Sequence, residues 1–158
     1  MSSQFVMYEE EFQHISAVCD RLTREANAKV VFLGDKNGQL IACTGQTENL
    51  DTTSLASLMA GQIAAAGGIA KLINEKEFNQ IFHEGERDNI HISIVAGRVI
   101  LVIIFDNRSS LGLVRLRVKK ASEELNRIFE VMMRKSDAPG AAPFAEITDE
   151  DIDNLFSE

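Results

Sequence analysis

The segment from Asp51 to Ile73 constrains this chain most, because it is long, apolar and crowded with small residues. Asp51, Thr52 or Thr53 can cap its start, and the spacing that follows predicts a helix. At about 100° per residue its larger apolar side chains gather on one face, together with Gln62, which has no obvious partner. This predicted core-facing stripe consists of Leu55, Leu58, Met59, Ala66, Ile69, Ala70, Leu72 and Ile73.

The opposite face of this helix carries little bulk and a single charge. Its residues are Ala56, Ala60, Gly61, Ala64, Gly67, Gly68 and Lys71. A face turned to water should be rich in charged side chains, and glycine inside a helix costs roughly 1 kcal/mol relative to alanine. Small residues suit a place where another backbone approaches closely. We therefore predict a docking surface for another protein chain; the alternative is a helix buried on both sides within its own domain.

The charge of the chain is concentrated at one end. Of its 158 residues 45% are apolar, which suits one compact domain, and the net charge of −8 argues against nucleic-acid binding. Residues 137–158 hold seven of the 24 acids and no base, so the remaining 17 acids nearly balance the 16 lysines and arginines. We predict a domain over residues 1–135 and an acidic tail over 136–158.

The sequence favours a soluble, cytoplasmic protein. Cys19 and Cys43 lie among apolar residues without a C-x-x-C pairing, as expected of reduced, buried thiols. The N-terminal residues are acidic and lack the basic stretch of a signal peptide. The longest uninterrupted apolar run, Val99–Phe105, is too short to cross a bilayer, so we expect no membrane insertion.

Periodicity along the chain predicts helices alternating with short strands. The helices are expected at residues 8–27, 51–73 and 109–135, and the strands at 30–33, 39–43, 78–82, 90–94 and 99–105. The order α-β-β-α-β-β-β-α predicts an α/β protein of the α+β kind, with a five-stranded antiparallel sheet and helices on its faces. The last strand is expected at the centre, because its continuous apolar run suits burial on both faces.

The last long helix has one continuous apolar seam. Its members are Leu111, Val114, Val118, Ala121, Leu125, Ile128 and Met132. Such a seam could form a coiled coil, but beside a sheet and with only about three heptads we favour packing on that sheet.

The C-terminal residues combine a flexible linker with a second amphipathic pattern. After the Pro/Gly/Ala-rich linker, Thr148 is placed as an N-cap and apolar residues recur at helical spacing. These residues are Ile147, Ile152, Leu155 and Phe156. About ten residues do not hold a helix alone in water. We predict an acidic helix that folds onto a partner; a merely solubilising tail is the alternative.

The motifs of small-molecule catalysis are missing from the sequence. Neither a G-x-x-x-x-G-K-[ST] loop nor a G-x-G-x-x-G after a strand is present, so we expect no bound nucleotide and no cofactor. His14, His83 and His91 lack metal-ligand spacing, and His91 is expected to face solvent. We predict no catalytic residue and no metal site, and therefore a protein that is not itself an enzyme.

With its elements placed, the sequence resembles the roadblock/dynein light-chain family, and within it the members from gliding bacteria. The resemblance covers nearly the whole chain. It is carried by VMYEEEF (6–12), AVCDRLT (17–23), NAKVVFLGDKNGQLI (27–41), DTTSLASL (51–58), GGIAKLI (67–73), FHEG (82–85), FDNRSSLGLVRLRVKKASEEL (105–125) and FAEITDEDIDNLFSE (144–158).

The resemblance implies a roadblock/longin-like homodimer whose subunits join their sheets edge to edge and lay their second helices side by side. It also implies that a Ras-like small GTPase binds across these helices, where Ala64 and Gly68 stand, with two subunits for each GTPase. Such members stimulate GTP hydrolysis without donating an arginine, by moving the switch regions of the GTPase. Their C-terminal extension binds elsewhere on the GTPase and modulates nucleotide exchange.

Three functions are open at this point: an activator of a small GTPase, a passive dimeric adaptor of the same fold, and a longin-like subunit of an exchange factor. The acidic C-terminal helix favours the activator, since an adaptor domain has no need of it.

Overall fold

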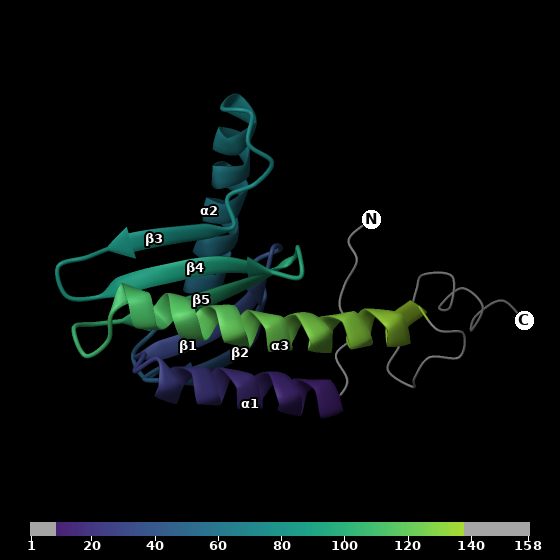
Figure 1. The fold of residues 1–158 in the computed structure, drawn as a ribbon, viewed down its shortest axis with the longest axis horizontal. Helices are drawn as coiled ribbons and strands as arrows, with labels where there is room; N and C mark the ends of the chain where they lie inside the picture. The colour runs from purple at the N-terminus through teal and green to yellow at the C-terminus, as the bar shows by residue number, and fades with distance from the viewer. Residues whose placement is uncertain (1–8, 138–158) are drawn as a thin grey trace, which may run out of the picture.

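The computed structural model describes residues 9–137, and within them the predicted order α-β-β-α-β-β-β-α is confirmed (Figure 1). The elements are α1 (Glu9–Glu25), β1 (Val30–Asp35), β2 (Leu40–Gly45), α2 (Thr52–Leu72), β3 (Gln80–Glu84), β4 (Asn89–Val95), β5 (Val99–Phe105) and α3 (Leu111–Asp137). The predicted C-terminal partner helix, with Ile147, Ile152, Leu155 and Phe156, lies outside the described residues.

The strands form one five-stranded antiparallel sheet in the order β2-β1-β5-β4-β3. β5 is central, with Ile103 opposite Val31 of β1 and Val102 opposite Ile92 of β4. All seven residues of β5 are buried, as its continuous apolar run predicts. β2 and β3 form the two edges of the sheet.

α1 and α3 lie side by side on one face of the sheet (Figure 1). The core residues of α3 are Val114, Val118, Ala121, Leu125, Phe129 and Met132. Ion pairs join the two helices: Arg21 pairs with Glu124, and Arg117 Nη1 lies 3.3 Å from Glu25 Oε2. The predicted seam therefore packs on the sheet and on α1, and Phe129 joins it.

α2 lies on the opposite face, across the strands rather than along them, and its C-terminal part extends past β3 beyond the edge of the sheet (Figure 1). A second core forms beneath its first part. The buried residues of this core are Val30, Phe32, Met59, Ala60, Ile63, Ile92, Ile100, Val102 and Ile104. Only part of α2 is therefore packed on the sheet.

His91 is buried, so the prediction that it faces solvent is wrong. It is 1% exposed and lies with Ser93 on the side of β4 that α3 covers, while the isoleucines of that strand point toward α2 on the other side. Burial, and then the charge of Arg115, lowers the pKa of His91. The alternation predicts one buried face, but α2 and α3 cover both faces of β4, so the polar members of the strand are buried as well.

The cysteines are free thiols. Cys19 is fully buried in α1, and burial, more than the charge of Asp20, raises the pKa of its thiol to about 12. The prediction of a buried, reduced thiol is confirmed for Cys19, whereas Cys43 on the edge strand β2 is only half-buried.

Candidate partner-binding surface on helix α2

α2 begins at a side-chain cap, as predicted. Asp51 Oδ1 accepts a hydrogen bond from the backbone N–H of Ser54 at 3.0 Å, and Asp51 Oδ2 accepts one from the Ser54 hydroxyl at 2.7 Å. The bond from the hydroxyl, followed by that from the backbone, lowers the pKa of the Asp51 carboxyl. The helix then runs for 21 residues, among which Lys71 alone is charged.

The face of α2 that packs on the sheet is not the one that the sequence predicts. Ala56, Met59, Ala60 and Ile63 are buried there, and a Cβ added to Gly34 of β1 would lie 3.8 Å from the Ala56 methyl group. Ala56 and Ala60, which the sequence places on the docking face, are therefore buried against the sheet, and half of the predicted core-facing stripe is exposed. Because α2 is apolar on nearly all sides, its periodicity does not select the buried face.

One flank of α2 exposes large apolar side chains. Its residues, called here the apolar flank, are Leu58 (68% exposed), Ile69 (55%), Leu72 (85%) and Ile73 (57%). Single exposed apolar residues are common on protein surfaces, but a cluster of them marks a contact with another molecule. Helical periodicity assigns these residues to the core of the domain, but the structure exposes them to solvent.

The other flank exposes small residues. Gly61, Ala64, Gly68 and Lys71, called here the small-residue flank, are exposed, and Gly67 beside them is half-buried. A Cβ added to any of these glycines would meet nothing within 4 Å outside the local helix backbone. Nothing in the described chain therefore requires glycine, although each costs roughly 1 kcal/mol of helix stability relative to alanine. This surface suits the close approach of another chain.

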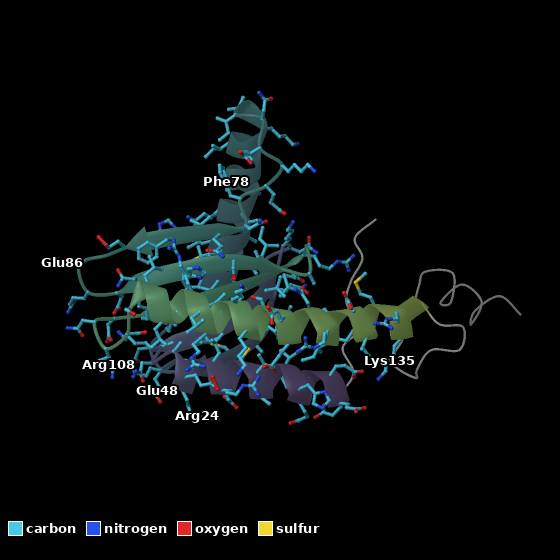
Figure 2. All side chains as sticks on the ribbon, in the orientation of Figure 1. Arg24, Glu48, Phe78, Glu86, Arg108 and Lys135 are labelled. Carbon is cyan, nitrogen blue, oxygen red and sulfur yellow. The ribbon has the colours of Figure 1, made fainter. Side chains whose placement is uncertain are left out.

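A groove lies beside the small-residue flank, between α2 and the sheet. It is lined by Lys36, Ala60, Ile63, Ala64, Ala66, Gly67, Glu77, Phe78 and Ile94. Lys36 of the β1–β2 turn and Glu77 of the loop before β3 form an ion pair of 3.3 Å, and Phe78 lies beside α2 (Figure 2). Sequence reasoning missed this groove because its residues come from four segments that share no common spacing.

Gln62 has a partner that the sequence does not reveal. Its side-chain Nε2 donates a hydrogen bond to Nε2 of His83 on the edge strand β3. His83 stands opposite Ile90 of β4, and Ile81 lies on the same face of β3. The contact therefore sits among half-buried isoleucines near the point where α2 leaves the sheet.

The exposed surfaces of α2 suit the binding of another molecule rather than catalysis. Among the described residues, α2 is the only helix whose length and composition would let it cross a membrane, but part of it packs on the sheet. The described residues also contain no group of three or more His, Cys, Asp or Glu side chains that could hold a metal ion. The two exposed flanks of α2 are therefore the candidate binding surfaces.

Comparison with known proteins relates the chain to one family. A family model described as Roadblock/LC7 domain matches residues 15–105. The solved structure of Myxococcus xanthus MglB is 69% identical and covers 80% of this chain and 96% of its own, with a TM-score of 0.77. Gliding protein MglB from Thermus thermophilus is 31% identical and covers 83% of this chain and 99% of its own, with a TM-score of 0.75. An uncharacterized protein of Methanocaldococcus jannaschii is 26% identical over 73% of this chain and 99% of its own length.

Proposed function

Because this chain belongs to the Roadblock/LC7 domain family, we propose that it is a homodimeric activator of a Ras-like small GTPase, MglA in the gliding bacteria whose proteins it resembles. It acts in the cytoplasm, at a cell pole, and controls polarity and gliding motility by raising the rate at which its partner hydrolyses GTP. α2 carries this proposal, since it extends beyond the sheet with an apolar flank and a small-residue flank that the described chain leaves exposed.

The apolar flank supports a second copy of the chain as one partner. α2 extends past its own edge strand β3, so its end would reach over the sheet of a copy that pairs along β3 (Figure 1). On the α2 side of that sheet, Ile81, Ile90 and Ile94 are only half-buried and match Ile69 and Leu72 in size and polarity. Two helix ends exchanged about a twofold axis cover both surfaces and remove the free β3 edges.

The small-residue flank supports the GTPase as the other partner. Ile69 and Ile73 lie on a different side of α2 from this flank, while Leu72 stands one turn from Gly68 at its border, so a copy that covers Ile69 and Ile73 leaves Gly61, Ala64 and Gly68 accessible. Gly61, Ala64 and Gly68 have no bulk to hold a switch region away from the helix, and Lys71 supplies one positive charge. Gly67 contributes from the adjacent groove.

Activation in this proposal needs no catalytic side chain from the present chain. Attack on the γ-phosphate needs an oriented water and stabilisation of the charge on the phosphate oxygens, and an arginine of the GTPase itself can provide the latter. A partner that binds the closed switch conformation more tightly shifts the population toward it. A shift from 1:99 to 99:1 needs about 5.5 kcal/mol of differential binding, which a few well-packed contacts can supply.

We assign the C-terminal residues a separate contact with the GTPase, one that modulates nucleotide exchange. The helical spacing of Ile152, Leu155 and Phe156 opposite an acidic face, with Ile147 before the cap, supports this role. Release of a fluorescent mant-nucleotide from the GTPase, measured with the full chain and with a chain lacking residues 136–158, tests it. We expect the release rate to differ between the two, and equal rates would leave the tail a solubilising role.

GTP hydrolysis by the GTPase, timed as phosphate release with and without the full chain, tests the main function. We expect the rate to increase and to saturate at two subunits for each GTPase. Binding in a pull-down with unchanged turnover would instead indicate the passive adaptor. Absence of binding at every concentration tried would contradict both functions.

A further inference from the structure

The Gln62–His83 contact is a polar pair whose neighbours on the sheet are apolar, and in the described chain it is exposed to solvent. On the sheet, His83 stands opposite Ile90 and shares its strand face with Ile81. On the helix, Gln62 lies on the same side of α2 as Ile69 and Ile73 of the apolar flank. A second copy that covers the apolar flank would therefore enclose this hydrogen bond.

The hydrogen bond depends on the protonation state of the ring. The amide nitrogen of Gln62 is a donor, so Nε2 of His83 has to accept, and only the neutral ring can accept. A second proton on the ring would place two donors face to face. Rotation of the Gln62 amide would restore a hydrogen bond, but it would leave a cation in an apolar contact, and this is unfavourable.

No acidic side chain of the packed elements is placed to stabilise that cation in the described structure. α2 contributes Lys71, which lies on the other flank, and β3 contributes Glu84, whose position next to His83 turns it to the opposite face of the strand. β4 carries no charged residue on this face, since His91 points to the side covered by α3.

We propose that His83, held by Gln62, makes the self-association of this chain sensitive to protons: the dimer forms with a neutral ring and weakens when the ring is protonated. The effect requires the homodimer of the proposed function. Histidine changes charge between about pH 5 and pH 8, so acidification over this range tests the proposal. With two rings in each dimer, the association constant would fall by at most about 100-fold.

Sedimentation velocity on the full chain at about pH 7.5 and about pH 5.5 tests this inference, with circular dichroism to confirm folding at both values. For the wild type we expect the dimer dissociation constant to rise by about tenfold to 100-fold on acidification. His83→Gln should dimerise at both pH values with a change of less than about twofold. His14→Gln, on the exposed side of α1, is the matched control and should behave as the wild type does.

The possible outcomes separate this inference from the proposed function. A wild-type dimer that is equally stable at both pH values overturns the role of His83 and leaves the homodimer in place. A pH dependence that persists in His83→Gln also overturns it. If that variant fails to dimerise near pH 7.5, His83→Leu gives the same comparison with a side chain that cannot be protonated. A wild-type chain that is monomeric near pH 7.5 contradicts the homodimer itself.

Discussion

Single residues of α2 decide whether a partner can reach its backbone. At Gly61 and Gly68 the structure has open space where a Cβ would stand, so alanine would fit there and would favour the helix by roughly 1 kcal/mol. Internal packing therefore gives no reason for glycine at these positions, whereas an external contact does. Added bulk on this flank should affect binding and leave folding unchanged.

Ala64→Arg and Gly68→Arg are expected to abolish binding of the GTPase in a pull-down while the circular dichroism spectrum and the dimer mass stay unchanged. Both positions are exposed, so an arginine can extend into solvent without disturbing the sheet. Ala17→Arg, on the exposed side of α1, is the matched control and should bind normally. Retained binding by both flank variants would contradict the location of the site.

His91 supports a prediction about pH and stability. Its ring nitrogens are buried without a hydrogen-bond partner among the described residues, and burial, then the charge of Arg115, holds its pKa below the ordinary value. The native state therefore keeps the ring neutral, while the unfolded chain binds a proton near pH 6.5. The free energy of unfolding should fall as the pH drops below that value, by at most about 1.4 kcal/mol per pH unit, until the lower folded pKa is reached.

Urea unfolding at about pH 7.5 and about pH 5.5, at one protein concentration, measures this effect. His91→Leu removes the titrating group from the core, so the variant should lose less stability on acidification than the wild type does. An equal loss in both proteins would show that other groups cause the acid sensitivity.

At the scale of whole elements, α2 and α3 use their apolar residues in opposite ways. Most of the seam of α3 is buried, and outside it Leu116 (62%) is the most exposed of the large apolar residues of α3, ahead of Val131 (41%) and Met133 (37%). α2 instead packs on the sheet through small residues and exposes its large ones. One exposed leucine needs no partner, but the apolar flank does.

The double substitution Ile69→Asp, Leu72→Asp is expected to convert the dimer into folded monomers. In the dimer these positions would bury carboxylates without a partner, which costs several kcal/mol, whereas in the monomer they face water. Size-exclusion chromatography with light scattering measures the mass, and Leu116→Asp is the matched control that should remain dimeric. A double variant that stays dimeric would place the self-association surface elsewhere.

At the scale of the whole molecule, the positions of the arginines among residues 9–137 bear on how a partner GTPase would be activated. Arg24 and Arg108 lie far from the extending part of α2 (Figure 2). Arg21 pairs with Glu124, and Arg108 Nε lies 3.1 Å from Asp106 Oδ1. These positions favour an activator that reshapes its partner over one that inserts an arginine.

Replacement of Arg21, Arg24, Arg87, Arg98 or Arg108 by alanine, one at a time, should leave most of the stimulation of GTP hydrolysis in place. Single-turnover hydrolysis at saturating activator isolates this effect from changes in affinity. A loss of about 10³-fold for any one of them would identify an arginine finger.

The amino-acid sequence by itself determined the order of the elements, the central place of β5 and the inward seam of α3. In each of these elements, apolar and polar residues alternate clearly or apolar residues form an uninterrupted run. The local pattern is therefore enough to predict the element and its buried face. The exposed part of the candidate site was also foreseeable, since Gly61, Ala64, Gly68 and Lys71 face outward as predicted.

Only the tertiary structure decided which side of α2 meets the sheet, that His91 is buried, and that Gln62 reaches His83. α2 is apolar on nearly all sides, so its own sequence does not determine which face packs on the sheet. Ala56 and Ala60 are small enough to suit either the sheet or an outer surface. The choice of face comes from strands β1, β4 and β5, which pack against α2 and lie outside its own sequence, just as α3 decides the burial of His91. Periodicity compares the apolar and polar positions within one helix or strand, whereas burial depends on which other elements pack against it.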